Sequence, residues 1–379
     1  MEAVKKPLQI TVCGNYGATN IGDEAILDGI LALLRRVKPD AKIAVLSANP
    51  AETASMHNVA SMPVLPCGLR SFAMGLFNGG IVKTLGLISK SDAFILGGGG
   101  LFTDEKMRAV LIWAIQARVA AFLGKAIFCL GQSVGPLRTF FGRRMTKKVF
   151  SRARAITVRD LSSQRVLHGL GLPYAQVLAD PAFGIHLEQR PAEIREKYVV
   201  FTIRPWIKGD SLNLYKFCAQ FIDWLWAEHG LKSVLVPFQQ LQDSDAEVLN
   251  NIFAQVQNKE AAHLYEFTAD YTKVIELIGK AKAVIGMRLH SLIFSTMTQT
   301  PFIALSYSDK VSSFVSDLTL ADYIMPWEEL TTEELKRRFN LLLKNYDHVR
   351  NTLMEQNILM RKKAHDHEEI LRSFFASIK

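Results

Sequence analysis

The sequence has few cysteines, and none of them forms the pairs that bind zinc or build a disulfide framework. The four cysteines, Cys13, Cys67, Cys129 and Cys218, are widely separated and make no CxxC motif. The N-terminal segment lacks the apolar core of a signal peptide, and no stretch approaches the roughly 20 apolar residues that cross a membrane. We therefore expect a cytoplasmic protein with reduced, buried thiols.

The closest candidate for a membrane span, residues 71–87, is interrupted by Gly75, by the run Asn78-Gly79-Gly80 and by Lys83. Such interruptions are typical of a loop and helix rather than of a membrane-spanning segment. A flap that touches a membrane surface is the alternative interpretation.

Acidic residues are absent between Glu105 and Asp160, where the chain carries twelve of its 45 basic side chains. Because the net charge of the chain is +9, the remainder sums to −3. A region of one sign attracts nucleic acid, a membrane surface or a phosphate-bearing substrate, and a solvated basic face is the alternative. The twelve are Lys106, Arg108, Arg118, Lys125, Arg138, Arg143, Arg144, Lys147, Lys148, Arg152, Arg154 and Arg159.

Short apolar segments alternate with amphipathic helical patterns in the first half of the chain. Strands are predicted at 8–12, 42–46, 93–96 and 126–130, and apolar residues recur at helical spacing after Ile26. This alternation indicates βαβ units and a mainly parallel sheet, so the predicted fold class is α/β.

The same alternation begins again after a polar segment at 186–197, which is the predicted linker because it is charged and contains Pro191. The predicted strands of this half are 198–203, 233–236, 283–285 and 302–305. Two α/β halves joined by a hinge leave a cleft. Ligands of open parallel sheets bind beyond the carboxyl ends of strands, so the loops after these strands are expected to line it.

These patterns divide the chain into three parts. An N-terminal domain is predicted at 1–187 and a C-terminal domain at 188–330. The remaining 331–379 is predicted to form helices that pack back on the N-terminal domain. It opens with Thr331 and Glu334 in a capping-box arrangement, followed by apolar residues on one helical face.

The first predicted strand is followed by the glycine-rich loop GNYGATNIGDE. It is neither a GxGxxG fingerprint nor a P-loop, because the glycine spacing differs and the lysine is missing. Asn15, Asn20 and Asp23 are suited to bind sugar hydroxyls, and Gly17 permits close approach of the backbone. Alternatively, Asp23 and Glu24 only stabilise the start of the next helix.

Two further loops with glycines are predicted at strand ends in this half. Gly97 to Gly100 follow one strand, and Gly131, Gln132 and Ser133 follow another. Of these residues, Gly99, Gly100 and Gln132 are the candidates for ligand contact. A tight structural crossover explains the glycines nearly as well.

The second half carries cations and a histidine at predicted strand ends. The run GMRLHS places Arg288 and His290 at a helix start, where backbone N–H groups and a guanidinium can hold a phosphate. An imidazole there can transfer a proton, although a structural histidine is the alternative. Arg204 and Lys310 follow neighbouring predicted strands. Three cations and a histidine suit a small, multiply charged anion.

Two common hydrolytic arrangements are missing from the sequence. No HExxH motif or carboxylate cluster favours a metal site, and no GxSxG elbow favours a serine nucleophile.

Seven segments in order resemble the polysaccharide pyruvyltransferase family over about residues 8–314: GNYGATNIGDEAIL, ILGGGGLF, LGQSVGPL, VRD, TIRPW, GMRLHSLIF and SYSDK. The chain looks closest to the bacterial cell-surface-anchoring type, CsaB. The resemblance implies two Rossmann-like domains facing a cleft in a GT-B-like fold, with phosphoenolpyruvate as donor. It also implies that Arg204, Arg288, Leu289 and His290 hold the donor.

For the acceptor, the resemblance implies a lipid-diphosphate-linked saccharide that carries N-acetylmannosamine and receives a 4,6-linked pyruvate ketal. The resemblance further implies that the product belongs to a secondary cell-wall polymer that surface-layer proteins bind. No metal or organic cofactor is expected, since phosphoenolpyruvate is a substrate. The expected acceptor contacts are Asn15, Gly17, Asn20, Gly99, Gly100 and Gln132.

The residues fit this chemistry, because a carboxylate and a phosphate call for Arg204, Arg288 and Lys310. His290 is the predicted acid, and Asp23 or Glu24 is the predicted base that activates the acceptor hydroxyl. The basic region then brings the enzyme to an anionic membrane surface or to the diphosphate of the acceptor. Nucleic acid is disfavoured, because no aromatic stacking motif accompanies the charge.

Two other functions compete with pyruvyl transfer. A GT-B nucleotide-sugar glycosyltransferase of envelope polysaccharide synthesis would use the same architecture. A non-catalytic polysaccharide- or nucleic-acid-binding protein would use the basic surface, and would tolerate His290→Ala.

Overall fold

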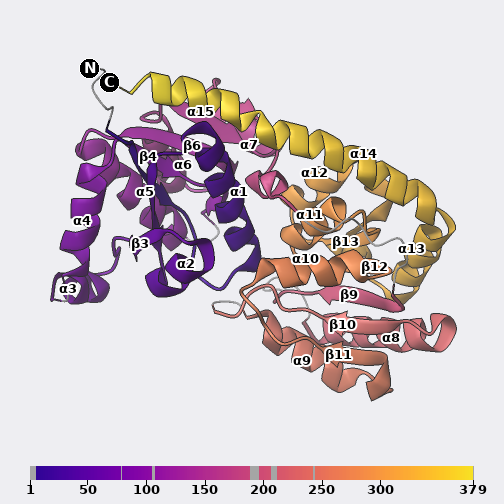
Figure 1. The fold of residues 1–379 in the computed structure, drawn as a ribbon. Helices are drawn as coiled ribbons and strands as arrows, with labels where there is room; N and C mark the ends of the chain where they lie inside the picture. Colours follow the sequence, from indigo (N-terminus) through magenta and orange to yellow (C-terminus); the bar gives the residue numbers. More distant parts are fainter. Residues whose placement is uncertain are drawn as a thin grey trace. The chain divides into compact units, whose positions relative to one another are not determined.

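A computed structural model describes residues 6–77, 79–104, 107–187, 196–205, 211–241 and 244–378. The chain forms two compact units (Figure 1). Unit 1 consists of Met1–Ala18, Asp23–Ile185 and Met360–Lys379, and unit 2 consists of Thr19–Gly22 and His186–Leu359. Each unit holds its own parallel sheet, so the α/β prediction is confirmed.

The sheet of unit 1 has eight strands in the described residues, in the order β3-β2-β1-β4-β6-β7-β8, with β5 paired to β6. All of these pairs are parallel. The strands are β1 (Gln9–Cys13), β2 (Lys42–Ser47), β3 (Ala60–Pro63), β4 (Ala93–Leu96), β5 (Gly99–Phe102), β6 (Ala126–Val134), β7 (Ala155–Val158) and β8 (Gln176–Val177).

Helices flank this sheet and connect its parallel strands. They are α1 (Ile21–Val37), α2 (Pro50–His57), α3 (Leu69–Phe77), α4 (Gly80–Lys90), α5 (Met107–Phe122), α6 (Phe140–Phe150), α7 (Leu161–Gly169), the short η1 (Pro181–Gly184) and, from the end of the chain, α15 (His367–Ala376). Acidic residues in the first turn of α1 and arginines in its last turn both favour the helix dipole.

The sheet of unit 2 has six parallel strands in the described residues, in the order β11-β10-β9-β12-β13-β14. The strands are β9 (Tyr198–Thr202), β10 (Lys232–Leu235), β11 (Ala262–Leu264), β12 (Ala283–Gly286), β13 (Phe302–Ser306) and β14 (Ile324–Pro326). The helices are α8 (Ser211–His229), α9 (Asp245–Gln255), α10 (Tyr271–Lys280), α11 (Leu289–Met297), α12 (Asp309–Asp317), α13 (Thr332–Lys344) and α14 (Tyr346–His365), with the short η2 (Lys259–Ala261), η3 (Ala321–Tyr323) and η4 (Trp327–Glu329).

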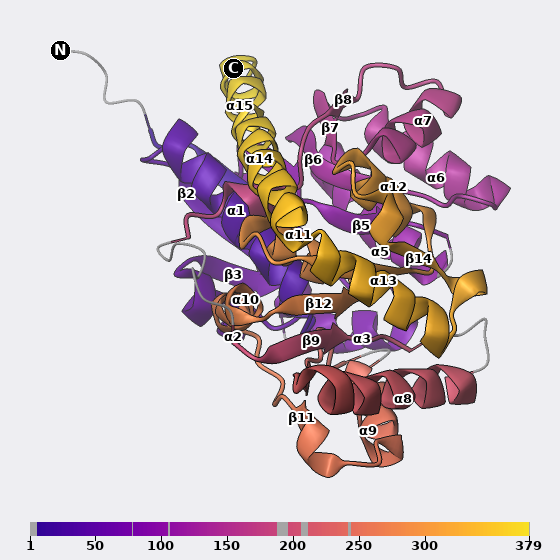
Figure 2. The same cartoon turned by 90° about the vertical axis from the view of Figure 1, so that its right-hand side faces the viewer.

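Central strands of both sheets are buried on both faces. Every residue of β4, β9, β12 and β13 is buried, which explains why these strands read as continuous apolar runs rather than as alternating patterns. Helices pack in neighbouring pairs beside the second sheet, α8 with α9 and α10 with α11 (Figure 2). The side chain of Thr331 accepts a hydrogen bond from Glu334 N and so caps α13 at the predicted place.

The structure corrects two predicted loops in unit 1. Residues 126–130 form only the first part of β6, which continues through Gln132 to Val134 because β5 and β7 pair with it on its two sides. Gly99 and Gly100 likewise belong to β5. The glycines that were predicted to lie in loops at these positions therefore lie in or beside paired strands.

Several predicted features lie partly outside the described residues. Lys106 of the basic region, Trp206 of the TIRPW segment and most of the linker at 186–197 fall there. Within the described residues, none of the helices combines the length and the apolar character needed to span a bilayer.

Candidate functional site

Three neighbouring strands of unit 2 deliver the predicted cations to one end of the sheet. Gly286 of β12 pairs in register with Thr202 of β9 on one side and with Ala304 of β13 on the other. Arg204 and Arg288 each lie two residues beyond these paired positions, so both follow the carboxyl ends of adjacent strands. This edge is where ligands of open parallel sheets bind.

Arg288 forms a two-pronged ion pair with Asp245, the first residue of α9. The Nε of Arg288 lies 3.1 Å from Asp245 Oδ2, and Nη2 contacts Asp245 Oδ1. The Asp245 side chain is fully buried and also accepts a hydrogen bond of 2.9 Å from Phe238 N. Burial raises the pKa of Asp245, although the Arg288 charge opposes the shift. Asp245 therefore fixes the orientation of Arg288, a role that the sequence patterns did not reveal.

Tyr307 connects the other two cations. Arg204 Nη1 donates a hydrogen bond of 2.8 Å to the Tyr307 hydroxyl, and its guanidinium lies 4.7 Å from the ring centroid. Lys310 Nζ lies 5.9 Å from the same centroid. Burial alone would raise the pKa of Tyr307, but the charges of Lys310, Arg204 and Arg288 lower it to about 8. Three cations thus act on one phenol, so they share one electrostatic environment.

Two helix starts face the same strand ends. Arg288 is the N-cap of α11 and Ser308 is the N-cap of α12, and neither side chain makes a capping hydrogen bond. In the described part of the chain, the buried Ser308 Oγ also has no hydrogen-bond partner. Because helix N-termini favour anions, the first turns of α11 and α12 add to the positive potential of the cations.

His290 and Leu289 occupy the first turn of α11. The His290 ring lies 6.2 Å from the ring of Phe294, one turn further along the helix. A side-chain carbon built on Gly22, which belongs to unit 2, would overlap the imidazole, so glycine is required there. The Leu289 side chain is buried in the core. Leu289 can therefore contribute to anion binding only through its backbone N–H.

In unit 1, Asn15, Asp23 and Gly99 lie together at the ends of β1 and β4. Asn15 Nδ2 donates a hydrogen bond of 2.8 Å to Asp23 Oδ2. A side-chain carbon built on Gly99 would lie 3.1 Å from Asp23 Oδ1, and the positive φ of Gly99 also favours glycine. These contacts hold the Asp23 carboxylate at the carboxyl edge of the sheet.

Glu24 is committed to a different set of contacts. Its Oε1 accepts a hydrogen bond of 2.8 Å from Gly17 N, and its Oε2 lies 2.9 Å from His57 Nε2. The other ring nitrogen of His57 lies 2.7 Å from Asp28 Oδ1, so the fully buried imidazole links two carboxylates of α1. Both Glu24 oxygens thus hold the glycine-rich loop and α2 against α1.

Asn20 and Gln132 make structural contacts. Asn20 Oδ1 accepts a hydrogen bond from Gly22 N, and its Nδ2 donates one of 2.8 Å to Gln239 Oε1. The buried Gln132 donates 2.8 Å to Leu96 O and also contacts Gly97 O, which joins β6 to the end of β4. Gly100 is exposed, with open space where a side chain would be.

The basic region divides into paired and exposed side chains. Arg159 is buried against Asp180, with 2.6 Å between Nη1 and Oδ2, and Arg154 donates to Ser377 O. In the basic region, a group of four exposed cations lies on α6: Arg143, Arg144, Lys147 and Lys148. The positive field predicted for this region therefore comes partly from α6, and exposed arginines outside this helix also contribute.

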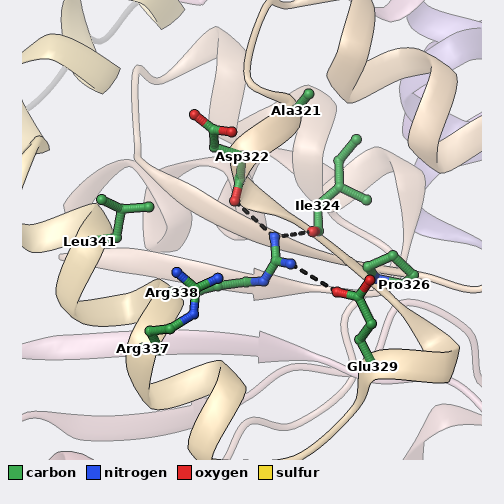
Figure 3. A pocket seen from close by; sticks show the side chains of 8 residues that line it. All are labelled: Ala321, Asp322, Ile324, Pro326, Glu329, Arg337, Arg338 and Leu341. Carbon is green, nitrogen blue, oxygen red and sulfur yellow. Dashed lines mark hydrogen bonds and ion pairs between the residues drawn. The ribbon is translucent and has the colours of Figure 1, made fainter.

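A cavity of about 360 Å³ elsewhere in unit 2 contains none of the predicted site residues. Figure 3 shows the Arg338 guanidinium pointing to the carbonyls of Asp322 and Ile324 and to Glu329. These groups occupy the arginine, so this cavity is a structural hollow beside β14. No group of three or more potential metal ligands occurs within the described ranges.

Comparisons with known proteins identify the family of the chain. Residues 20–309 match the family model described as polysaccharide pyruvyl transferase. The amylovoran biosynthesis protein AmsJ of Erwinia amylovora is 23% identical over 397 residues, covering 90% of this chain and 94% of that protein.

The fold is similar to solved structures of very low sequence identity. A UDP-N-acetylglucosamine 2-epimerase structure from Listeria monocytogenes has a TM-score of 0.66 at 12% identity, covering 98% of both chains. HepE of Anabaena, solved with UDP and glucose, has a TM-score of 0.64 at 11% identity, covering 98% of this chain and 100% of that one. These similarities confirm the predicted GT-B-like fold with two Rossmann-like domains. Because its model matches most of the chain, the family assignment is also confirmed, and this protein belongs to the polysaccharide pyruvyl transferase family of enzymes.

Proposed function

We propose that this enzyme transfers the pyruvyl group of phosphoenolpyruvate to two hydroxyls of a sugar in a lipid-diphosphate-linked polysaccharide precursor. The observation that carries the proposal is the convergence of Arg204, Arg288 and Lys310 on Tyr307 at the starts of α11 and α12. A carboxylate and a phosphate on a three-carbon unit match this concentration of positive charge.

In the proposed reaction, His290 gives a proton to the methylene carbon of phosphoenolpyruvate, and positive charge develops on the central carbon. One sugar hydroxyl forms a bond to that carbon and loses its proton. The bond between the carbon and the phosphate oxygen breaks, the second hydroxyl closes the ketal, and the proton of this hydroxyl passes to the departing phosphate. Arg204 and Arg288 stabilise the departing phosphate.

For the acceptor proton, we propose Asp23 rather than Glu24. Both oxygens of Glu24 are engaged by Gly17 N and His57, which makes this carboxylate a positioning group. Asp23 accepts a hydrogen bond from Asn15 and lies beside Gly99 at the carboxyl edge of the sheet, where ligands of open parallel sheets bind. Asp23→Asn is therefore expected to slow turnover far more than Glu24→Gln.

The experiment is phosphate release from phosphoenolpyruvate with a synthetic lipid-diphosphate disaccharide. Acceptors that end in N-acetylmannosamine, glucose or galactose test the cell-wall specificity implied by the CsaB-type resemblance. We expect Arg288→Ala to raise the KM for phosphoenolpyruvate and His290→Ala chiefly to lower kcat. Arg372→Ala is the matched control, because Arg372 is an exposed arginine on α15.

Two results would contradict the proposal. Unchanged kinetics in both Arg288→Ala and His290→Ala would remove these residues from the site. Sugar transfer from a nucleotide sugar, without phosphate release from phosphoenolpyruvate, would instead favour a glycosyltransferase.

A further inference from the structure

The helices α3 and α4 of unit 1 form a pair that exposes large apolar side chains, here called the apolar hairpin (Figure 1). Phe77 is 98% exposed and Val82 is 65% exposed. Of the fifteen exposed large apolar side chains in the described residues, five belong to this short segment. The five are Met74, Leu76, Phe77, Val82 and Leu85.

The opposite side of the hairpin is anchored to the body of unit 1. Ile81 and Ile88 of α4 are buried, and Thr84 Oγ1 donates a hydrogen bond of 2.8 Å to Pro63 O at the end of β3. A side-chain carbon built on Gly75 of α3 would lie only 2.9 Å from Ile81 Cγ1, so this glycine lets the two helices pack closely. The exposed apolar face is thus held in place by a well-packed one.

The charged residues of this segment have one sign. The sequence contains no acidic residue between Glu52 and Asp92. Arg70, Lys83 and Lys90 are all exposed on the two helices. Exposed apolar residues interspersed with cations are the signature of an element that lies in the interface of an anionic bilayer.

We propose that the apolar hairpin docks on an anionic lipid bilayer. Phe77 and Val82 enter the boundary of the acyl chains, while Arg70, Lys83 and Lys90 contact lipid phosphates. A bilayer fits better than a protein partner because the described charged side chains of the hairpin are all cations, two of them lysines, and lysine is depleted at protein interfaces. The purpose of this docking rests on the proposed function, since a lipid-linked acceptor is confined to a membrane.

The test is cosedimentation of the full chain with vesicles of equal parts phosphatidylglycerol and phosphatidylcholine, compared with phosphatidylcholine alone. We expect binding to the anionic vesicles that weakens with added salt. The double substitution Phe77→Ser with Val82→Ser should reduce the partition coefficient by about tenfold or more. Lys83→Gln should weaken binding to the anionic vesicles only.

Phe122→Ser is the matched control, because Phe122 is 88% exposed at the end of α5, outside the hairpin. The control should bind like the original chain. Equal binding by the double variant, or no binding by the original chain, would overturn the proposal. A concentration-dependent dimer that the double variant abolishes would assign the hairpin to a second copy of the chain instead, and would also overturn it.

Phosphate release with a short-chain, water-soluble acceptor separates this inference from the proposed function. The double variant should retain full activity in that assay, while losing activity on acceptor embedded in vesicles. Vesicle binding without any phosphate release would contradict the proposed function and leave the docking surface intact. Equal activity of the double variant on both acceptors would contradict the docking surface alone.

Discussion

Asp245 is the residue on which the orientation of Arg288 depends. Its buried carboxylate forms a bidentate ion pair with the guanidinium, and the Arg288 side chain is only 14% exposed. Removing one partner of a buried ion pair leaves the other charge buried and uncompensated. Asp245→Asn should therefore lower the free energy of unfolding of unit 2 by about 3 kcal/mol. It should also raise the KM for phosphoenolpyruvate. Urea unfolding and steady-state kinetics measure the two effects.

Glu333→Gln provides the control for Asp245→Asn. Glu333 pairs with Lys336 on α13 but is 83% exposed, so its loss should change stability by less than about 1 kcal/mol. If Asp245→Asn behaves like this control, the pair does not hold Arg288.

Tyr307 reports the positive potential of the donor site. With its pKa lowered to about 8 by Lys310, Arg204 and Arg288, the hydroxyl becomes a phenolate in mildly alkaline solution. The added negative charge opposes an anionic donor, so the KM for phosphoenolpyruvate should rise as pH increases through about 8. In Tyr307→Phe this rise should disappear.

Ultraviolet titration isolates Tyr307 from the other tyrosines of the chain as the difference between the original protein and Tyr307→Phe. Replacing Lys310 with Met removes one lowering charge, so the pKa of Tyr307 should move upward. An unchanged titration in Lys310→Met would mean that this cation lies too far away to act on the phenol.

The sequence permitted prediction of the cations but not of their partners. Arg204, Arg288 and Lys310 stood out because each follows a predicted strand, and parallel topology brings such positions together. Asp245 lies 43 residues before Arg288 and carries no motif, so only the folded chain pairs them. Gln132 was misread for a related reason, because a glycine before it looked like a strand end while β6 in fact continues.

At the scale of elements, His57 joins α2 to α1. Burial by itself would lower its pKa, but hydrogen bonds and charges from Asp28 and Glu24 raise the pKa of His57 from 6.5 to about 9. A pKa raised in the folded state stabilises the fold fully below pH 6.5, and this stabilisation is lost as pH rises through about 9. The loss should amount to about 3 kcal/mol in unit 1.

Urea unfolding at intervals of about one pH unit between pH 6 and 10 measures how steeply the free energy of unfolding falls with pH. His57→Gln should flatten it, whereas His168→Gln on the exposed surface of α7 should leave it unchanged. A slope that persists in His57→Gln would assign the pH dependence to other groups.

Element prediction succeeded for central strands and failed for short ones. The strand at 93–96 is correct to the residue, and 198–203 and 302–305 differ from β9 and β13 by one residue, because uninterrupted buried apolar runs mark such strands. The two or three residues of β8, β11 and β14 are too few to show any period. In β5 two glycines hide the strand, since glycine disfavours strands on its own.

At the scale of the whole molecule, the end of the chain belongs to the unit in which the chain begins. Residues 360–379 group with unit 1, where α15 buries Leu371, Phe374 and Phe375. The Phe374 ring lies 5.3 Å from that of Phe128 in β6, and Arg36 of α1 pairs with Glu368 at 2.7 Å. The core of unit 1 therefore combines residues that are far apart in the sequence, from β6 and from α15.

This arrangement makes the effect of a change in α15 specific to one unit. Phe374→Ala removes a buried aromatic side chain and should destabilise unit 1 by about 3 to 4 kcal/mol. In hydrogen exchange, amides of β6 and β7 should exchange faster, while those of β9 and β12 keep their original rates. Arg372→Ala on the exposed side of α15 should change neither set. Equal acceleration in both sheets would mean that the two units unfold as one, and that α15 stabilises the whole chain rather than unit 1.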